Sequence, residues 1–505
     1  MLRAYVRGVG DNFGWRFLAV LASAYVGVKG LVNILTISNF LPYFRDVLDI
    51  RGAQYQALFT VARLPSSLKA LIGMLSDTVP IGGYHKRYYI VLAGLMGGLA
   101  CVLLAVLPLQ DFGGGALAAS LVFLVSLEAA TVDLLVQGVY AKLMVSQPHT
   151  GADLVSAAWG FFQVGSFIAA GLVGGLAGRT NPRVLFWVTL PAALQVIVPV
   201  LAGWLPEDRT TVRFHSDRVR ANAVYFGLGA AMGAAALGLG AVSLFGDTIA
   251  QAAYSLSVSA VLVGASLWFL PKRLGRAMTY LFLAATMDLN IRGAVDFFYT
   301  ANEECLPGGP AFSLSFYLAW TGMIGSVAGI LGVALFQACL SRSWYRRAFW
   351  TTTLLQVAAA TVDIVIVQRW NRRVGISDRV FYILGGSMLQ EVVYMLDFMP
   401  AVVLISKLCP PGVESTVYAL LAGFANFGFS VASALGALAI DLFGIRARAP
   451  CDFGKLAWLI FAAKMVLPLL TVPLTFLLIP DARMTDDLVG ALTPAGGLAL
   501  VVGLY

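Results

Sequence analysis

Charged side chains stand inside long apolar runs of this chain, where a bilayer would offer them no water. Five bases lie at such places, and they are Lys29, Arg63, Lys69, Arg292 and Lys464. A charge held in hydrocarbon costs ~2.5–3.5 kcal/mol on the gentler insertion scales, so a buried base is by default a candidate functional residue. At mid-membrane such a base could bind the anionic part of a solute or exchange ion-pair partners. Nothing near Lys464 in the chain distinguishes it, and we predict no role for it. Arg63 lies near one end of its run, where its head group can reach the membrane surface.

Carboxylates occupy corresponding places in two other apolar runs. Glu128 and Asp133 lie in 115–141, whereas Glu391 and Asp397 lie in 379–405. Because burial disfavours the charged form, such acids can take up and release protons, or accept hydrogen bonds from a polar ring. We expect them to act in a proton relay or in solute binding.

Asp288, Arg292 and Asp296 are spaced four residues apart within 277–300, so they would share one face of a continuous helix. Two interpretations stay open. The three side chains could line a solute cavity, which we favour. Alternatively, an Asp–Arg–Asp pairing could lock this helix to a neighbour, because pairing is the cheapest way to hold arginine in lipid.

Lys29, Lys69, Glu414 and Asn426 complete the set of candidate solute-binding residues. Lys69 lies near the middle of the second apolar run and could meet an anionic solute. It could also pair with an acid of the fourth run, and the two roles could alternate. For Glu414 and Asn426, simple helix packing is the alternative.

A charged turn follows the second apolar run. Gly73 and Asp77 end the run, a Pro/Gly turn follows, and a basic cluster with Lys86 and Arg87 opens the next run. We predict that Asp77, Lys86 and Arg87 form an ionic latch at the membrane rim.

The elements that position these residues must be membrane helices. Hydrophobic residues make up 59% of the 505 and charged residues only 12%, and the mean hydropathy is +0.83. About 20 apolar residues cross a bilayer, which predicts an all-α polytopic membrane protein of about fourteen spans. These are expected near 17–40, 57–78, 88–108, 115–141, 154–178, 183–204, 223–245, 248–270, 277–300, 312–338, 347–367, 379–405, 412–440 and 455–479.

An even number of spans puts both termini on one side of the membrane. The loops on that side carry the larger share of Lys and Arg, so the positive-inside rule predicts cytoplasmic termini. The corresponding acids of the fourth and twelfth spans indicate an internal duplication. We therefore expect a six-helix bundle in 1–204, a loop and an inserted helix pair in 205–276, a second bundle in 277–480, and a tail in 481–505.

Several classes of function are excluded. The net charge of +8 resides in short loops between apolar runs, which argues against a nucleic-acid partner. The cysteines show no C-x-x-C spacing and the histidines are scattered, so we expect no metal site and no cofactor. No catalytic motif such as H-E-x-x-H occurs in the spans, so an enzyme is not expected. Cys305 and Cys451 fall in loops on the same side, where one bridge is an option, but we expect free thiols.

Several blocks at both ends of the membrane region together resemble the folate–biopterin transporter family, a branch of the major facilitator superfamily, and its kinetoplastid members most of all. The blocks are GVKGL at 27–31, Pro42-Tyr43, Asp46, Gln54-Tyr55, Lys69, Ser76-Asp77, Pro80-Ile81, Gly83-Tyr84, and PPGVESTVYALLAGFANFG at 410–428. In one respect the chain departs from the pattern, because Ser66-Ser67 stand before Lys69 where many relatives have a tryptophan nearby.

The resemblance implies a secondary active transporter of two six-helix bundles plus an inserted pair. It would import folate- or biopterin-type pteridines by alternating access, with protons as a candidate coupling ion, across the plasma membrane. Two alternatives remain, which are transport of another metabolite such as S-adenosylmethionine and a solute receptor without flux. A folate ligand should depend strongly on Lys69 or Arg292, and neutral biopterin less so.

Overall fold

The computed structural model describes residues 2–112, 114–146, 151–176, 180–211, 214–408, 414–448 and 451–486. Within this part of the chain, thirteen helical stretches are long and apolar enough to cross a bilayer. They match thirteen of the fourteen predicted spans. Most of the predicted tail 481–505 and the start of the block at 410–428 lie outside the described residues. The fold is all-α, as the sequence predicts.

The first bundle follows a short helix, α1 (Leu2–Phe13), and spans residues 15–201. Its first two membrane crossings are not regular α-helices throughout, because π-helical turns interrupt the first and a 3₁₀ turn interrupts the second. The elements are α2 (Trp15–Ala22), η1 (Ser23–Val32), α3 (Asn33–Pro42), η2 (Tyr43–Val47), α4 (Gly52–Arg63), η3 (Leu64–Leu68), α5 (Lys69–Thr78), α6 (Arg87–Val106), η4 (Leu109–Phe112), α7 (Gly115–Ser146), α8 (Gly151–Leu176), α9 (Arg183–Leu194) and α10 (Ile197–Leu201).

The second bundle spans residues 272–478 and also contains irregular turns. Its elements are α14 (Lys272–Met287), α15 (Arg292–Thr300), η5 (Ser315–Trp320), α16 (Thr321–Leu335), η6 (Phe336–Leu340), α17 (Tyr345–Val367), α18 (Trp370–Arg373), α19 (Asp378–Tyr382), η7 (Ile383–Leu389), α20 (Gln390–Lys407), α21 (Glu414–Leu442), α22 (Leu456–Ile460), η8 (Phe461–Val466), α23 (Leu467–Leu469) and α24 (Thr471–Leu478).

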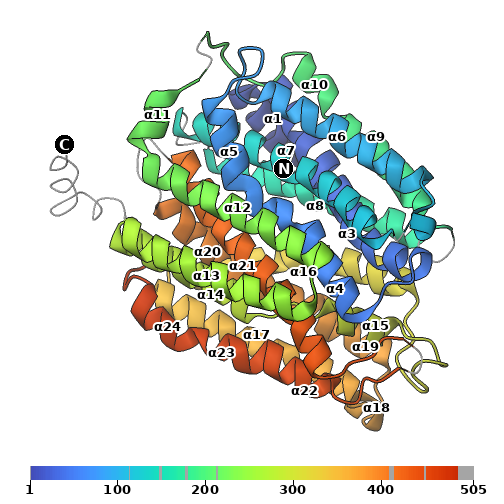
Figure 1. Cartoon of the computed structure of the whole chain (residues 1–505). Helices are drawn as coiled ribbons and strands as arrows, with labels where there is room; N and C mark the ends of the chain where they lie inside the picture. Colours follow the sequence, from blue (N-terminus) through green and yellow to red (C-terminus); the bar gives the residue numbers. More distant parts are fainter. Residues whose placement is uncertain are drawn as a thin grey trace.

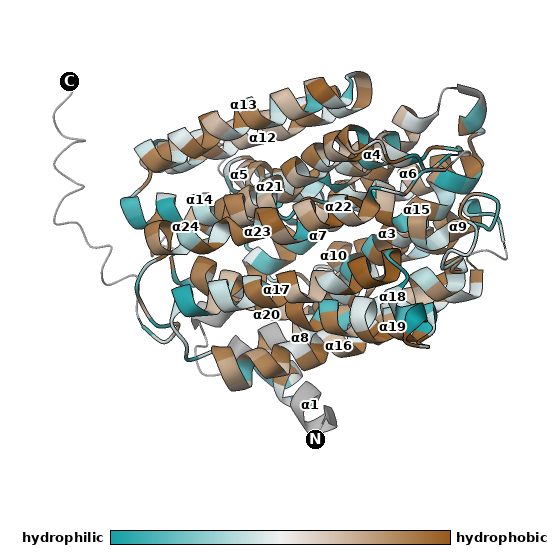
Figure 2. Cartoon of the chain, turned by 90° about the horizontal axis from the view of Figure 1, so that it is seen from below, coloured by the Kyte–Doolittle hydropathy of each residue, from teal (hydrophilic) through white to brown (hydrophobic). Residues whose placement is uncertain are grey.

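Between the bundles lie α11 (Ser216–Ala221) and an inserted hairpin, α12 (Ala223–Phe245) and α13 (Thr248–Phe269). The side chain of Asp247 accepts a hydrogen bond from the N–H of Ala250 at 2.7 Å and so caps the start of α13. Helix α12 packs against α4, η3 and α5, whereas α13 packs against α14 and α21. The pair therefore touches both bundles. Figure 1 shows it crossing the front of the molecule beside α14, and Figure 2 shows it at one edge.

The outward faces of the helices are apolar, as a bilayer requires (Figure 2). Large side chains such as Phe245 and Trp268 on the inserted pair are 85% and 84% exposed. In water such surfaces would drive aggregation, whereas in lipid they are solvated. The chain is a multi-pass membrane protein.

The ninth predicted span is broken, which corrects the expectation of one continuous helix over 277–300. Helix α14 ends at Met287 and α15 begins at Arg292. In the turn between them, the N–H of Asn290 donates to the carbonyl of Ala432 on α21 at 3.3 Å, and its Oδ1 accepts from the N–H of Arg292 at 3.2 Å. Neighbouring groups thus satisfy the backbone freed by unwinding, as buried backbone requires. Asp288, Arg292 and Asp296 consequently do not share one helical face.

Cys305 and Cys451 form a disulfide, so the expectation of free thiols at these positions is wrong. Their loops, which follow α15 and α21, come together on one face of the second bundle, where the rings of Phe298 and Phe453 lie 5.6 Å apart. Two loops packed in this way bring the sulfurs into bonding range. We call this side of the molecule the disulfide face, and the opposite side, where Trp15 begins the first span, the N-terminal face.

The two bundles touch closely at the disulfide face. The side chain of Gln56 on α4 donates to Ser433 Oγ on α21 at 2.6 Å and accepts from the N–H of Gly293 on α15 at 2.8 Å. A Cβ atom at Gly293 would lie 2.3 Å from the carbonyl oxygen of Gly52, so only glycine permits this approach. These contacts join the two bundles near the disulfide face.

Candidate functional site

A cavity with two connected lobes lies between the bundles. The lobe toward the N-terminal face has a volume of about 400 Å³, and the lobe toward the disulfide face about 720 Å³. Lys29, Trp159, Asp288, Tyr394 and Lys464 are among the residues that line both lobes, so they mark the junction. Cavities between the bundles are the usual place for solute sites in transporters of this architecture.

On the first bundle, one carboxylate holds two lysines. Asp133 of α7 accepts hydrogen bonds from Lys29 Nζ at 2.9 Å and from Lys69 Nζ at 2.7 Å. Lys29 comes from η1 and Lys69 from the first turn of α5, so the cluster joins three helices. The lysine side chains are 21% and 16% exposed, because they face the cavity. The pairing that the sequence offered as one role for Lys69 is present, and one positive charge is left over.

The ammonium of Lys29 also lies on aromatic faces. It is 4.7 Å from the ring centroid of Trp159 and 5.0 Å from that of Tyr25. Cation–π contacts of this kind stabilise a desolvated ammonium by about 0.5–2 kcal/mol. They fix the position of Lys29 at the junction of the lobes.

On the second bundle, Lys464 forms an ion pair with Asp288 at 2.8 Å. Asp288 sits in the unwound turn after α14, and Lys464 comes from the π-helical turn η8. The sequence analysis did not place Lys464 among the site residues. It was nevertheless one of five bases inside a span, and that signal could have identified it.

Two further acids of the second bundle are held by tyrosines. Asp363 accepts from Tyr299 Oη at 2.5 Å and from Gln390 Nε2 at 2.9 Å. Asp296 accepts from Tyr317 Oη at 2.7 Å and from Tyr55 Oη at 3.3 Å. Asp363 lines both lobes. It was not predicted as a site residue, because nothing near it in the sequence distinguishes it.

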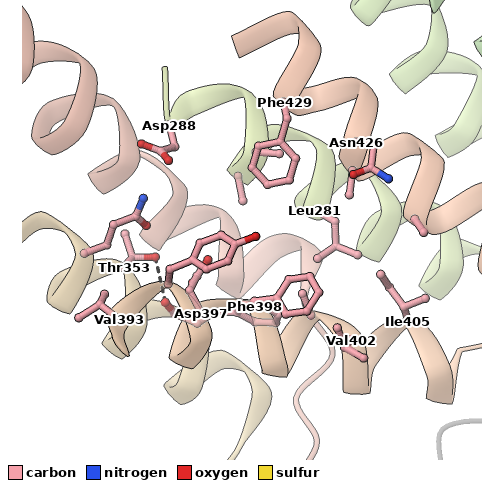
Figure 3. Close-up of a pocket in the computed structure, with 18 of the residues that line it drawn as sticks. Leu281, Asp288, Thr353, Val393, Asp397, Phe398, Val402, Ile405, Asn426 and Phe429 are labelled. Carbon is pink, nitrogen blue, oxygen red and sulfur yellow. Dashed lines mark hydrogen bonds between the residues drawn. The ribbon is translucent and has the colours of Figure 1, made fainter. Parts of the chain in front are cut away.

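Asp397 and Glu391 also face the cavity, Asp397 in the lobe nearer the N-terminal face and Glu391 in the other. Asp397 accepts a hydrogen bond from Thr352 Oγ1 at 2.7 Å. In Figure 3, Asn426 and Phe429 project from one wall of this lobe, and Asp397, Phe398 and Val402 project from the other. The α21 wall and the α20 wall thus face each other across the cavity.

Aromatic side chains lie at the junction of the two lobes. The rings of Tyr394 and Phe398 are nearly parallel with centroids 6.0 Å apart, and Trp159 lies 6.0 Å from Phe398. Tyr394 and Phe429 are 49% and 48% exposed although they line the cavity. Their faces are therefore open to a bound solute. The sequence analysis did not single out these aromatics.

The remaining candidates take different places. Arg292 lines the lobe nearer the disulfide face, with its guanidinium 5.2 Å from the ring centroid of Phe59. Asn426 donates to the carbonyl of Ser66 at 3.1 Å, which joins α21 to the first bundle. Helix α21 begins at Glu414, whose side chain lies outside the described part of the structure.

The structure does not bring Glu128 to the cavity. Its side chain is fully buried where α6 packs on α7, against Gly97, and neither carboxylate oxygen has a partner within the described residues. Asp133, five positions on along α7, points to the cavity instead. Helical periodicity places these two acids on different faces of α7.

Of the predicted latch residues, Asp77 lies at the end of α5 and Lys86 and Arg87 lie at the start of α6, while the latch itself stays a prediction. The backbone N–H groups of Lys86 and Arg87 donate to the carboxylate of Glu207 at 2.7 and 3.1 Å, at the start of α6. The guanidinium of Arg87 lies 4.0 Å from the ring centroid of Tyr84. Asp77 is in the last turn of α5, half-buried and in contact with a neighbour. The loop after α10 is therefore attached to the turn that carries the latch motif.

Comparison with known proteins decides the family. Residues 29–491 match the BT1 family, which is nearly the whole chain. The chain belongs to the BT1 family. The BT1 match runs through both bundles and the inserted pair, so the resemblance seen in the sequence is confirmed.

Relatives of this BT1 chain include the probable folate-biopterin transporter 2 of Arabidopsis thaliana, 25% identical over 96% of this chain and 88% of the relative. The folate-biopterin transporter of Synechocystis is 28% identical over 91% of this chain and 82% of the relative. Like these relatives, the BT1 chain is a transporter and not an enzyme.

Solved structures show the same fold. The peptide transporter POT in complex with sulfate superposes with a TM-score of 0.66 at 15% identity and covers 92% of this chain and 96% of its own. A mutant of the nucleoside transporter NupG gives 0.61 at 13% identity, with coverage of 91% and 98%. The BT1 chain thus has the major-facilitator architecture that the sequence predicted.

Proposed function

We propose that the chain imports folate- or biopterin-type pteridines by alternating access. The observation that carries this proposal is the cavity between the bundles, which combines aromatic faces, a lysine pair and several carboxylates. A pteridine offers a flat ring, N–H donors along one edge and, in folates, a glutamate with two carboxylates. The relatives whose printed names refer to folate and biopterin point to the same class of substrate.

Alternating access is supported by the asymmetry of the closure. Gln56, Ser433 and Gly293 join the bundles at the disulfide face, while the smaller lobe extends toward the N-terminal face. We assign the structure to a state closed at the disulfide face. Rocking the bundles about the cavity would break these contacts and expose the site to the other side.

Proton coupling is our proposal for the driving force. Asp363, Asp397 and Glu391 line the cavity on the second bundle, and each lacks a lysine or arginine within ion-pair distance among the described residues. Carboxylates held in this way can exchange protons as the cavity opens to each side.

The disulfide supports one orientation in the membrane. Structural disulfides form in oxidising compartments, so the disulfide face would lie outside and both termini in the cytoplasm. The basic loops at the N-terminal face agree with this assignment. We place the protein in the plasma membrane.

The test is uptake by the purified chain in proteoliposomes, with and without a pH gradient across the membrane. We expect accumulation of radiolabelled folate or biopterin, accelerated when the side facing the disulfide is more acidic. Saturable binding without accumulation would instead identify a receptor. Accumulation of S-adenosylmethionine but no pteridine would assign another metabolite.

A further inference from the structure

The charges that line the cavity are divided between the two bundles. The wall from the first bundle carries Lys29 and Lys69 against the single acid Asp133. Two cations and one anion leave this wall with a charge of +1 at full ionisation. Asp133 is already shared between both lysines, so the surplus charge is available to a ligand.

The wall from the second bundle has the opposite sign. Its acids are Asp288, Asp296, Asp363, Glu391 and Asp397, and its cations are Arg292 and Lys464. Five acids and two cations give −3 at full ionisation. Protonation of some of these acids would make the wall less negative. It would not make the wall a better anion site than the lysine pair.

The acids of the second wall differ in how much acceptor capacity remains. Asp288 is paired with Lys464, and Asp296 accepts from two tyrosines. Among the described residues, Thr352 alone donates a hydrogen bond to Asp397, and Oδ1 accepts it. The Oδ2 atom of Asp397 can therefore accept a hydrogen bond from a ligand. A carboxylate with an unused oxygen suits the adjacent N–H donors of a ring edge.

Aromatic side chains from both bundles line the junction of the two lobes. Trp159 comes from the first bundle, and Tyr394, Phe398 and Phe429 come from the second. A flat ring stacked here would have lysines on one side and carboxylates on the other. The arrangement therefore distinguishes the two ends of an elongated ligand.

We propose that the substrate bridges the bundles in one direction, with its carboxylate tail on Lys29 and Lys69 of the first bundle and its nitrogen-rich ring edge on Asp397 of the second. The tail competes with Asp133 for the lysines. This inference rests on the proposed function and adds to it the orientation of the ligand. It also predicts that ring and tail are recognised by different bundles.

The experiment separates the ligand into its parts. Binding of three probes to the purified full chain is measured by isothermal titration, with biopterin as ring alone, p-aminobenzoyl-glutamate as tail alone, and folate as both. Lys69→Gln should lower the affinity for p-aminobenzoyl-glutamate and for folate about tenfold or more, because one charge-assisted hydrogen bond is lost. It should leave the affinity for biopterin within about twofold. Asp397→Asn should weaken biopterin and folate to a similar extent and spare the tail.

Two further variants guard against misfolding. Lys29→Gln leaves the pair of Lys69 and Asp133 intact and should reproduce the effect of Lys69→Gln. Gln56→Ala, outside the cavity, should leave the affinity ratio of the three probes unchanged. Equal weakening of all three probes by Lys69→Gln and Asp397→Asn, or the reversed pattern, would overturn the orientation. If the wild-type chain binds no pteridine at all, the proposed function fails first and the orientation with it.

Discussion

Asp133 accepts hydrogen bonds from two lysines that belong to two other helices. Its charge is therefore part of the structure as well as part of the site. Without it, two ammonium groups would face each other in a cavity of low polarity. A carboxylate in this position holds the first, second and fourth spans together in the absence of substrate.

Asp133→Asn should destabilise the folded chain because it leaves two lysines without a counter-charge. We expect a loss of about 1–3 kcal/mol, since the lysines are partly exposed to the cavity. Lys69→Gln should cost less, because Lys29 and Asp133 still pair one to one. The measurement is thermal unfolding of the purified protein in detergent. A matched control is Asp481→Asn, which removes the exposed partner of Arg346 and should have no effect. Equal losses in Asp133→Asn and Lys69→Gln would contradict this account.

Among the elements, α15 and the start of α4 bring the two bundles into close contact. Gly293 faces the carbonyl of Gly52 there, and the side chain of Gln56 bonds across the same contact. The unwound turn before α15 separates this short helix from α14. We expect this local contact to help close the disulfide face.

Gly293→Ala should disfavour the closed disulfide face, because the added Cβ would clash with Gly52. Overpacking of this kind costs about 1–3 kcal/mol. Thr321→Cys, which lines the lobe near this face, would report the change. In a Cys339→Ser background, we expect several-fold faster labelling by an impermeant maleimide applied to the disulfide face. Gly171 has open space around it, so Gly171→Ala is the control and should leave the labelling rate of Thr321→Cys unchanged. Unchanged labelling in Gly293→Ala would show that this contact does not close the face.

A second element-scale contact attaches the loop after α10 to the start of α6. Glu207→Gln should weaken this attachment, since the carboxylate accepts from the N–H groups of Lys86 and Arg87 at the positive end of a helix. The expected loss is about 1 kcal/mol of local stability. Limited trypsin digestion should then cut the loop faster. Asp208→Asn, exposed and one residue away, is the control. Identical digestion of both variants would argue against the attachment.

Hydropathy predicted the spans because a bilayer requires about 20 apolar residues regardless of packing. The break in the ninth span was not predictable, since MDLNIR contains neither proline nor glycine. Contacts from α21 stabilise it, and these exist only in the folded chain. Lys464 and Asp363 were missed for the same reason. Their roles depend on Asp288, Tyr299 and Gln390, which lie far from them in the chain. Asp133 was predicted because acids recur at corresponding places in the twelfth span, a pattern that Asp363 and Lys464 lack.

At the scale of the whole molecule, some links hold one bundle together and others join the two. The disulfide between Cys305 and Cys451 belongs to the first kind, because both loops are in the second bundle. The ion pair between Arg448 and Asp49, at 2.6 Å, belongs to the second kind. Under the proposed alternating access, only links of the second kind would have to break.

Replacing both bridged cysteines, Cys305→Ser with Cys451→Ser, should lower stability by about 2–4 kcal/mol. The initial uptake rate per folded molecule should not change, because the bridge does not cross between the bundles. Thermal unfolding and uptake measured on the same preparation check both statements. Cys339→Ser, an exposed free thiol, is the control for loss of a sulfhydryl. Slower uptake at unchanged stability would mean that the bridge takes part in the cycle.

The inserted pair makes the lipid boundary of the molecule unequal. It covers the seam where α4 and α5 meet α21, whereas the opposite seam, between α8 and α16, carries exposed side chains such as Phe167 and Val327. Figure 2 shows the pair and these two helices at opposite edges. Under the proposed alternating access, lipid tails would repack mainly along the α8–α16 seam. The energetic cost of switching should therefore depend on bilayer thickness and fluidity at that one edge.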